Sequence, residues 1–324
     1  MTEQLKLKLN DSKATRWGAL VIVAFTMMAA YYVNDVVAPL KTMLETDLAW
    51  SSTDFGFFTG GYSFLNVFFL MLIWGGLILD RFGIRFTGKL ATILMVGGTA
   101  LEYYAMTGLA GADATLFGIN EIFGYKTGVF VAFAGYSIFG VGAEVAGITV
   151  SKIIAKWFKG KELATAMGVQ VALARIGSQA GYAVAIPLAR AFGISTPVLL
   201  GLVLLLGGMI AFFVFAVMDK KLDKQMEAAA IAAGTEDEEE KFSFKDVKNI
   251  LVNPGFWLIA LLCVLFYSCV FPFQKFASEL MIIKYGINEN VAGTFAGLPA
   301  LEALILTPVF GGFIDKRGKS ASIM

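Results

Sequence analysis

The sequence contains no histidine, only two cysteines and little charge. Without histidine, no imidazole is present to act as a general base, to relay protons or to ligate zinc. Cys263 and Cys269 fall inside one apolar stretch, where we expect packing rather than a disulfide or a metal site. The sequence also has no nucleophile elbow, no phosphate-binding loop after a strand and no basic nucleic-acid surface. We therefore expect no enzyme activity, no metal, no cofactor and no nucleic-acid partner, and a coupled proton would have to be carried by a carboxylate.

Charged residues make up only 16% of the 324 residues, whereas 57% are hydrophobic. A soluble globular protein could not bury so much apolar side chain in one core. Several stretches hold about 20 apolar residues with almost no charge, the length of a helix that crosses a bilayer. The first begins near Trp17 and is followed by no small-residue cleavage pattern, which favours a retained helix over a signal peptide. The composition predicts an all-α polytopic protein embedded in a lipid bilayer.

Eight membrane-spanning helices can be placed along the chain. We expect them at residues 17–40, 53–79, 87–109, 127–155, 163–190, 196–218, 254–283 and 290–313. The segment 111–126 is then a loop, and the polar stretch 219–253 is predicted to be a solvated linker. The chain is thus divided into a six-helix bundle at 1–218, a cytoplasmic linker at 219–253 and the start of a second bundle at 254–324.

Basic residues are distributed unevenly between the two sides of the predicted membrane. All but six of the 26 Lys and Arg residues precede the first span or lie in the connections on that same side. The exceptions are Lys41, Lys126, Arg175, Arg190, Lys275 and Lys284. Cytoplasmic loops collect Lys and Arg, so the N-terminus is predicted to be cytoplasmic. The short N-terminus has no obvious sorting tail, which favours a bacterial inner membrane over a lysosome.

Two segments that lie six helices apart resemble each other. The segment from Gly76 to Arg85 reads GLILDRFGIR, and the segment from Gly311 to Lys319 reads GGFIDKRGK. Transporters are often built from such repeats, with the substrate site at the repeat interface near the membrane midplane. The glycine permits close helix approach, and Asp80 can form an ion-pair cluster with Arg81 and Arg85 at the cytoplasmic edge. A tight turn in a positively charged loop would explain the charges but not their repetition.

The repeated pattern Gly-x-x-x-Asp-Arg/Lys-x-Gly-x-Arg/Lys resembles the loop signature of the major facilitator superfamily. In that family the cluster helps to latch one conformation of the transporter, and the resemblance implies the same role here. The implied latch residues are Gly76, Asp80, Arg81, Gly83, Arg85, Gly311, Asp315, Lys316 and Arg317. The resemblance also implies the family's fold, with the N-terminal six-helix bundle complete and the C-terminal bundle partial. Because one bundle without its partner cannot alternate access, we expect residues 1–324 alone to be a fragment or partial gene product that does not transport.

A narrower resemblance extends from Tyr32 to Lys319. It is carried by the segments GYSIFGVGAE at 135–144, WFKGKE at 157–162, LARIGS at 173–178 and FPF at 271–273. These segments are similar to the branch of the superfamily that contains the lysosomal dipeptide transporter. Tyr136 departs from this branch, in which an arginine is expected. The resemblance implies transport of dipeptides by alternating access, with Glu144 and Arg175 at the positions that hold the two charged ends of the peptide.

Glu144 and Arg175 are also predicted to lie at one depth in the membrane, independently of any family. Glu144 precedes Phe158 by 14 residues, and Arg175 follows Lys161 by 14 residues. Antiparallel neighbouring helices then place both about 21 Å from the connecting loop. A charge there costs about 2.5–3.5 kcal/mol, so the two are functional candidates by default. The forked guanidinium of Arg175 could bind a substrate carboxylate, and Glu144 could bind a substrate ammonium, so the two suit a zwitterion. The alternative is a structural ion pair between Glu144 and Arg175.

Other polar residues extend the predicted site. Asp35 on the first helix could bind an amine or carry a proton, whereas Glu102 on the third helix is predicted to be a packing or lipid-shielded carboxyl. The predicted substrate-binding set is Glu144, Arg175, Asp35, Asn34, Gln170 and Gln179. Lys275 and Glu279 are spaced i, i+4 beyond Pro272, where a helix break is expected. This pair is either an outer gate or a simple interfacial ion pair.

Two other functions remain open at this point. In a proton-coupled carrier of organic anions or amino acids, Arg175 would bind a lone carboxylate and Glu144 would handle protons. In a non-transporting membrane scaffold or sensor, the fold would serve partner proteins. The repeated latch argues against a scaffold, because a static protein needs no conformational clasps. The sequence identifies no accessory subunit.

Overall fold

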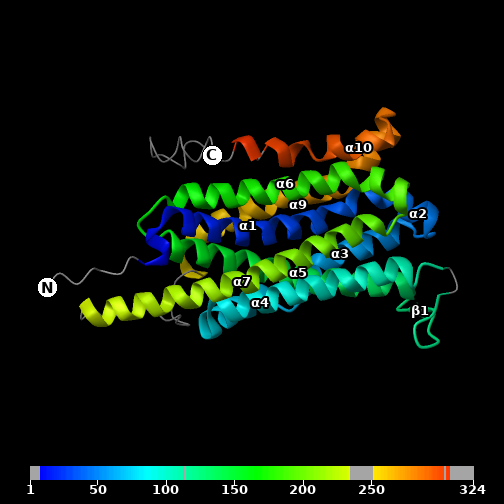
Figure 1. Ribbon diagram of the computed structural model, residues 1–324. Helices are drawn as coiled ribbons and strands as arrows, with labels where there is room; N and C mark the ends of the chain where they lie inside the picture. The colour runs from blue at the N-terminus through cyan, green and yellow to red at the C-terminus, as the bar shows by residue number, and fades with distance from the viewer. Residues whose placement is uncertain (1–7, 112–113, 234–250, 303, 307–324) are drawn as a thin grey trace.

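The computed structural model describes residues 8–111, 114–233, 251–302 and 304–306 of the chain. Long helices run side by side along one axis, with the N-terminal residues at one end and a short hairpin at the other (Figure 1). The end that holds residues 8–11 is the proximal end, and the end that holds the hairpin is the distal end. The elements are η1 (Leu9–Asp11), α1 (Lys13–Val36), η2 (Ala38–Leu40), α2 (Lys41–Asp47), α3 (Ser52–Phe68), α4 (Met71–Thr107), β1 (Glu121–Ile122), β2 (Tyr125–Lys126), α5 (Thr127–Trp157), α6 (Leu163–Phe192), α7 (Thr196–Ala233), α9 (Pro254–Tyr285) and α10 (Glu289–Ala296).

Helix is present at each predicted span where the structure describes it, and the predicted all-α class is confirmed. Four helical stretches among the described residues are long and apolar enough to cross a membrane: Lys13–Asp47, Thr127–Trp157, Thr196–Ala228 and Pro254–Tyr285. The pair α3 and α4 forms a fifth candidate. The predicted span at 290–313 begins with α10, and its residues from 307 onward lie outside the described part of the chain.

The prediction of one continuous helix at 53–79 is wrong. α3 ends at Phe68, and α4 begins after Leu70, whose backbone is left-handed at φ 52°. The two helices are bent by 58°. A left-handed leucine is uncommon and must be held by its surroundings. No glycine or proline lies between residues 62 and 74 to mark this break in the sequence.

The turn between the second and third predicted spans is made by Gly83. Its φ of 75° and ψ of 172° interrupt α4. Only glycine adopts this region of backbone conformation readily, because it has no Cβ. The glycine of the repeated loop pattern is therefore needed for the path of the backbone.

A hairpin at the distal end was not predicted within the loop 111–126. β1 pairs antiparallel with β2, with Glu121 opposite Lys126 and Ile122 opposite Tyr125. The two turn residues, Phe123 and Gly124, both have positive φ, as tight hairpin turns require. The pairing occupies only two residues in each strand, which is too short to leave an alternating pattern in the sequence.

The predicted boundary between helix and linker at residue 218 is also wrong. α7 continues to Ala233, and Asp219, the first residue of the predicted linker, is fully buried. The charged residues after 218 are not all solvated, because Asp219 and Asp223 form ion pairs with α4 and α5. Residues 234–250, including the acidic run from Glu236 to Glu240, lie outside the described residues.

The helices α1 to α7, which form the first half of the described structure (residues 8–233), pack tightly around one core. α4 lies along α5, α1 lies against α6 and α7, and α3 lies against α5. At the crossing of α4 and α5, a Cβ added to Gly98 would lie 2.5 Å from the carbonyl oxygen of Gly135 and 2.4 Å from the backbone nitrogen of Phe139. Gly135 of α5 is equally close to α4, because a Cβ added there would lie 2.6 Å from the carbonyl oxygen of Gly98.

This contact gives a prediction with an adjacent control. We expect Gly98→Ala to lower the free energy of unfolding by about 1–3 kcal/mol, because the added methyl group would overlap the α5 backbone. Gly97 has no neighbouring atom within 4 Å of an added Cβ. Gly97→Ala should be neutral or stabilise by about 0.5–1 kcal/mol, since alanine favours helix over glycine. Thermal unfolding of the two variants in detergent checks this, and equal changes would contradict the described packing of α4 on α5.

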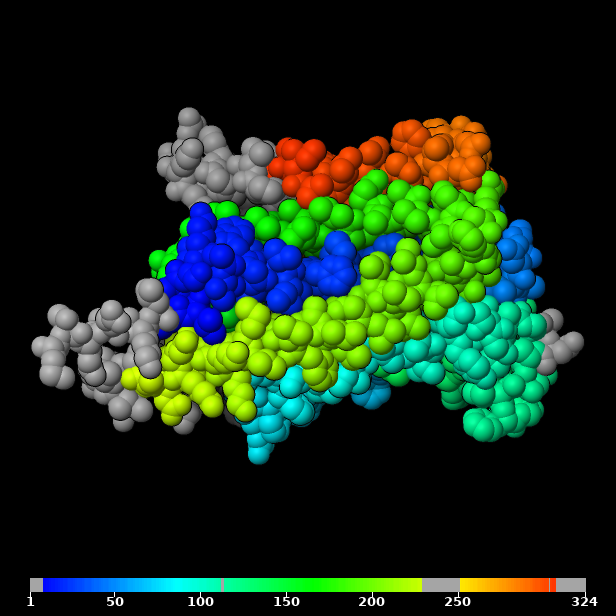
Figure 2. Space-filling model, in the orientation of Figure 1, coloured from blue at the N-terminus to red at the C-terminus, as the bar shows by residue number. Residues whose placement is uncertain are grey.

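The second half contributes α9 and α10, which lie on the first half. α10 lies against α6, as Figure 2 shows, and α9 contacts η2 and α2 at the distal end. Many apolar side chains of α9 are exposed, including Leu258, Leu262 and Val264. The arrangement brings one polar stretch of α9, from Lys275 to Glu279, against the distal half of the first bundle.

Candidate functional site

A cavity of about 520 Å³ lies between the two halves of the described structure. It is lined by α1, α3 and α5 of the first half and by the Phe271–Phe276 part of α9. Among the described residues that line it, only Glu144 and Lys275 are charged. Polar and aromatic side chains, among them Tyr31, Asn34 and Tyr62, complete the wall. A mostly apolar cavity with one anion and one cation is suited to a small molecule that carries both charges.

Glu144 reaches the cavity from α5. Its carboxylate accepts a hydrogen bond of 2.8 Å from the hydroxyl of Tyr62 on α3. The Tyr62 ring lies 5.7 Å from the ring of Tyr136, which in turn stacks on Phe139 at 5.8 Å. Tyr62 supplies one donor, so the carboxylate keeps further acceptor capacity for a ligand.

Arg175 is not paired with Glu144 in this structure. Its guanidinium lies over the ring of Tyr31, 5.3 Å from the ring centre, and the described ion pairs do not include it. Arg175 does not line the cavity, but Tyr31 does. The alternative of a structural Glu144–Arg175 ion pair therefore has no support in the described contacts. Arg175 thus contacts a residue of the cavity wall without lining the cavity itself.

Asn34 and Asp35 meet Lys275 next to the cavity. Lys275 Nζ donates to the backbone oxygen of Asn34 at 2.6 Å and to the hydroxyl of Tyr136 at 3.1 Å. Tyr136 in turn donates to the backbone oxygen of Asn34 at 2.8 Å. Asp35 Oδ1 accepts from the Asn34 amide at 2.8 Å and lies 3.9 Å from Lys275 Nζ. Tyr136, the position at which an arginine was expected, thus holds Lys275 and Asn34 together.

The remaining predicted polar residues lie away from the cavity lining. Gln179 on α6 is half-buried, and a Cβ added to Gly297 in the second half would lie 2.4 Å from its Oε1. Gln170 on α6 is half-buried and makes no described side-chain hydrogen bond. Glu102 is fully buried on α4, and neither carboxylate oxygen has a hydrogen-bond partner among the described residues. Its burial agrees with the predicted packing role.

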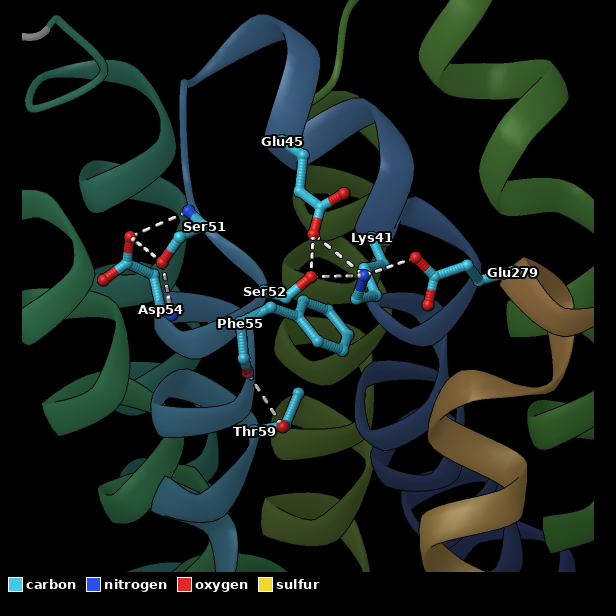
Figure 3. A network of polar contacts seen from close by, with 8 residues as sticks. All are labelled: Lys41, Glu45, Ser51, Ser52, Asp54, Phe55, Thr59 and Glu279. Atoms are coloured by element: carbon cyan, nitrogen blue, oxygen red, sulfur yellow. Dashed lines mark hydrogen bonds and ion pairs between the residues drawn. The ribbon is translucent and has the colours of Figure 1, made fainter. Parts of the chain in front are cut away.

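An ion-pair cluster joins the two halves near the distal end. Figure 3 shows Lys41 of α2 surrounded by three partners: Glu45 of α2, Ser52 of α3 and Glu279 of α9. Lys41 Nζ lies 2.8 Å from Glu45 Oε1, 2.9 Å from Ser52 Oγ and 2.5 Å from Glu279 Oε1. The Lys41 side chain is 2% exposed. Glu279 therefore joins the two halves through Lys41. Of the two alternatives for Lys275 and Glu279, a simple ion pair between them is not among the described contacts, because the two residues bind different partners of the first half.

A second contact joins the halves near the distal end. Arg190 on α6 forms an ion pair with Glu289 and donates to Asn290 at 2.8 Å, both at the start of α10. These side chains are about half-exposed. Together with the Lys41–Glu279 ion pair, this contact joins the halves on the distal side of the described structure.

The repeated loop pattern lies at the proximal end, where its first copy forms ion pairs. Asp80 lies 2.8 Å from Lys152 of α5, and Arg85 binds Asp219 and Asp223 of α7. The expected pairing of Asp80 with Arg81 and Arg85 is wrong. The break at Gly83 separates Asp80 from Arg85, so each side chain meets a neighbouring helix instead.

The other latch residues have fewer described contacts or none. The guanidinium of Arg81 lies over the ring of Phe82, and Gly76 has no atom within 4 Å of an added Cβ. The second copy of the pattern, with Gly311, Asp315, Lys316 and Arg317, lies outside the described residues.

Asp219 is the centre of the proximal cluster and was missed in the sequence. Its Oδ1 accepts from Lys156 at 2.8 Å and from the indole nitrogen of Trp157 at 3.0 Å, and its Oδ2 accepts from Arg85 at 3.1 Å. A fully buried carboxylate with three donors is well compensated. Asp219 directly follows the apolar stretch 196–218. If the helix continues past this stretch, a charged residue at its end can face the protein interior, and this position could have indicated a buried carboxylate.

A further ion pair ties the N-terminal residues to the loop between α5 and α6. Arg16 donates to Glu162 Oε2 at 2.8 Å. This hydrogen bond lowers the pKa of Glu162 below its ordinary value. A lowered pKa stabilises the fold above the pKa of the unfolded chain, and the contribution is lost as the pH falls through the folded-state value. Because Glu162 is exposed, screening by solvent keeps this contribution small.

Comparisons with known proteins agree with this architecture. The family model described as Major Facilitator Superfamily matches residues 17–324. The chain is 27% identical over 315 residues to a protein of Pongo abelii named lysosomal dipeptide transporter MFSD1, covering 93% of this chain and 61% of that protein. It is 27% identical over 321 residues to the Homo sapiens protein of the same name, covering 95% and 63%. A Gallus gallus protein of that name is 32% identical over 199 residues, covering 57% and 43%. The chain thus spans less than two thirds of the length of these relatives.

Proposed function

Because the chain belongs to the major facilitator superfamily of membrane transporters, we propose that it serves the transport of small peptides, dipeptides first, by alternating access. The observation that carries this proposal is the cavity between the halves, whose described lining contains one anion, Glu144, and one cation, Lys275. A peptide with a free ammonium and a free carboxylate matches both charges. The names of the relatives, which describe them as dipeptide transporters, support the same substrate class.

In this proposal Glu144 binds the ammonium group of the peptide. Its carboxylate lines the cavity and carries only the Tyr62 hydrogen bond among the described residues. Arg175 binds the carboxylate end by moving from the face of Tyr31 into the cavity, since among the described residues only the contact with the Tyr31 ring holds its guanidinium. Asn34 and Asp35 shape the polar end of the cavity beside Lys275, and Gln170 and Gln179 provide polar surface on α6.

Alternating access would require the ion pairs at the two ends to open and close in turn. The Lys41–Glu279 and Arg190–Glu289 contacts join the halves distally and would have to open when the distal side opens. At the proximal end, Asp80 and Arg85 would act as latch residues through α5 and α7. The role of Gly311, Asp315, Lys316 and Arg317 as the second latch is proposed from the sequence repeat alone.

The protein is an integral membrane protein, and its orientation is part of the proposal. The excess of Lys and Arg at the proximal end supports a cytoplasmic N-terminus. The names of the relatives describe those proteins as lysosomal, so they give no support to the expected bacterial inner membrane.

A panel of ligands tests the substrate class. A ligand that binds the folded state raises its apparent stability. We expect dipeptides to raise the melting temperature of the protein in detergent, and single amino acids, tripeptides and carboxylates without an amine to raise it less. A carboxylate without an amine that stabilises as well as a dipeptide would favour a proton-coupled carrier of organic anions. If no ligand of the panel acts and a partner protein co-purifies, the scaffold alternative is favoured.

A further inference from the structure

Lys275 and Lys41 are both lysines between the two halves, but their hydrogen bonding differs. An ammonium group has three N–H donors. Lys41 has three oxygen acceptors within 2.9 Å, and two of them belong to carboxylates. Lys275 has two acceptors, the backbone oxygen of Asn34 and the hydroxyl of Tyr136, and both are neutral. Lys41 is therefore saturated, whereas Lys275 retains one donor without an acceptor among the described residues.

The charge of Lys275 is also poorly compensated. The nearest described carboxylate oxygen, Asp35 Oδ1, lies 3.9 Å away, which is beyond a hydrogen bond, and it already accepts from the Asn34 amide. The Lys275 side chain is 16% exposed. A charge with so little contact to water needs a close counter-charge to offset its loss of hydration. The cavity that Lys275 lines is the open side from which a counter-charge can come.

We propose that Lys275 is a specificity-determining residue that binds the free carboxylate of the transported peptide. The proposal rests on the proposed function and adds a carboxylate-binding residue to it, in the second half of the protein. Glu144 and Lys275 then face the cavity from α5 and α9, so one zwitterionic ligand contacts both halves. The carboxylate takes the third donor of Lys275 while the bonds to Asn34 and Tyr136 remain. Arg175, whose guanidinium lies over the ring of Tyr31, can share this carboxylate only after it moves into the cavity.

The test compares two ligands that differ only at the carboxyl end. Dissociation constants of alanyl-alanine and of alanyl-alanine amide are measured for the wild type and for Lys275→Met. We expect the wild type to bind the acid about 10- to 100-fold more tightly than the amide, the range of one charge-assisted hydrogen bond. In Lys275→Met this preference should fall to about threefold or less, while the affinity for the amide stays close to the wild-type value.

Three further variants keep the result interpretable. Lys284→Met removes an exposed lysine from the same helix that does not line the cavity, and it should keep the wild-type preference. Lys275→Gln keeps a donor for Asn34 and Tyr136 but lacks the charge, so it replaces Lys275→Met if that variant does not fold. Lys275→Arg restores the charge and should restore a preference for the acid.

The outcomes separate this proposal from the proposed function. If Lys275→Met or Lys275→Gln weakens acid and amide equally, or keeps the full preference for the acid, Lys275 does not bind the carboxylate, although the peptide site stands. If Arg175→Met abolishes the preference while Lys275→Met does not, the carboxylate is bound by Arg175 alone. If the wild type binds neither ligand, the proposed substrate class fails as well.

Discussion

Replacing Asp219 with alanine is expected to lower the free energy of unfolding by about 3 kcal/mol. The Asp219 carboxylate is fully buried and receives hydrogen bonds from Lys156, Trp157 and Arg85. Its removal leaves the indole nitrogen of Trp157 without a partner and removes one counter-charge from two cations. The loss stays below that of an isolated buried pair because Arg85 and Lys156 are partly exposed and keep Asp223.

The control for this prediction is Asp223→Ala in the same cluster. Asp223 pairs with the same two cations, but its side chain is 40% exposed. We expect this change to cost about 1 kcal/mol or less, since water screens exposed ion pairs. Unfolding of both variants in detergent, followed by tryptophan fluorescence, gives the comparison. Equal losses would show that burial of Asp219 does not decide the stability of the proximal cluster.

Glu144→Gln is expected to weaken dipeptide binding by about 30-fold or more. A carboxylate that pairs with an ammonium in a site shielded from water contributes at least about 2 kcal/mol to binding when one partner is removed. Tyr62→Phe, which removes only the 2.8 Å hydrogen bond to Glu144, should cost less than about tenfold. Titration calorimetry on the purified variants measures both effects.

The matched control for Glu144→Gln is Glu102→Gln. Both changes remove a carboxyl group within the helical bundle, but Glu102 is fully buried on α4 and does not line the cavity. Dipeptide affinity should therefore remain within about threefold of the wild type in Glu102→Gln, which removes no cavity contact. Comparable losses in the two variants would mean that Glu144 acts through general stability rather than as the ammonium-binding residue.

The sequence predicted the helices well because apolar length is a local property. It also placed Glu144 inside the membrane, and the structure puts this residue on the cavity. The break at Leu70 escaped prediction since no glycine or proline marks it, and the continuation of α7 past residue 218 escaped because its charges looked solvated. Both features depend on neighbouring helices, which composition does not reveal.

The pairing of charges was the least predictable part of the site. Lys275 and Glu279 are one helical turn apart, and sequence spacing alone suggested a pair. In the structure Glu279 binds Lys41, which is 238 residues away, and Lys275 binds Asn34 and Tyr136. Such partners follow from how α9 is rotated against the first half. Arg175 and Glu144 are likewise unpaired, although their depths were predicted to match, because Arg175 lies over Tyr31 and Glu144 accepts from Tyr62.

The cavity between the halves is proposed to bind a small peptide, with the peptide ammonium at Glu144 and its carboxylate at Lys275. A crystal or cryo-electron-microscopy structure of the protein with a bound dipeptide would show where each charged end lies. We expect the peptide in the cavity of about 520 Å³, with its ammonium within hydrogen-bond distance of Glu144 and its carboxylate within hydrogen-bond distance of Lys275. A dipeptide bound elsewhere, such as in the proximal cavity of about 610 Å³ beside Asp80 and Lys152, or bound with its ammonium away from Glu144, would contradict this proposal.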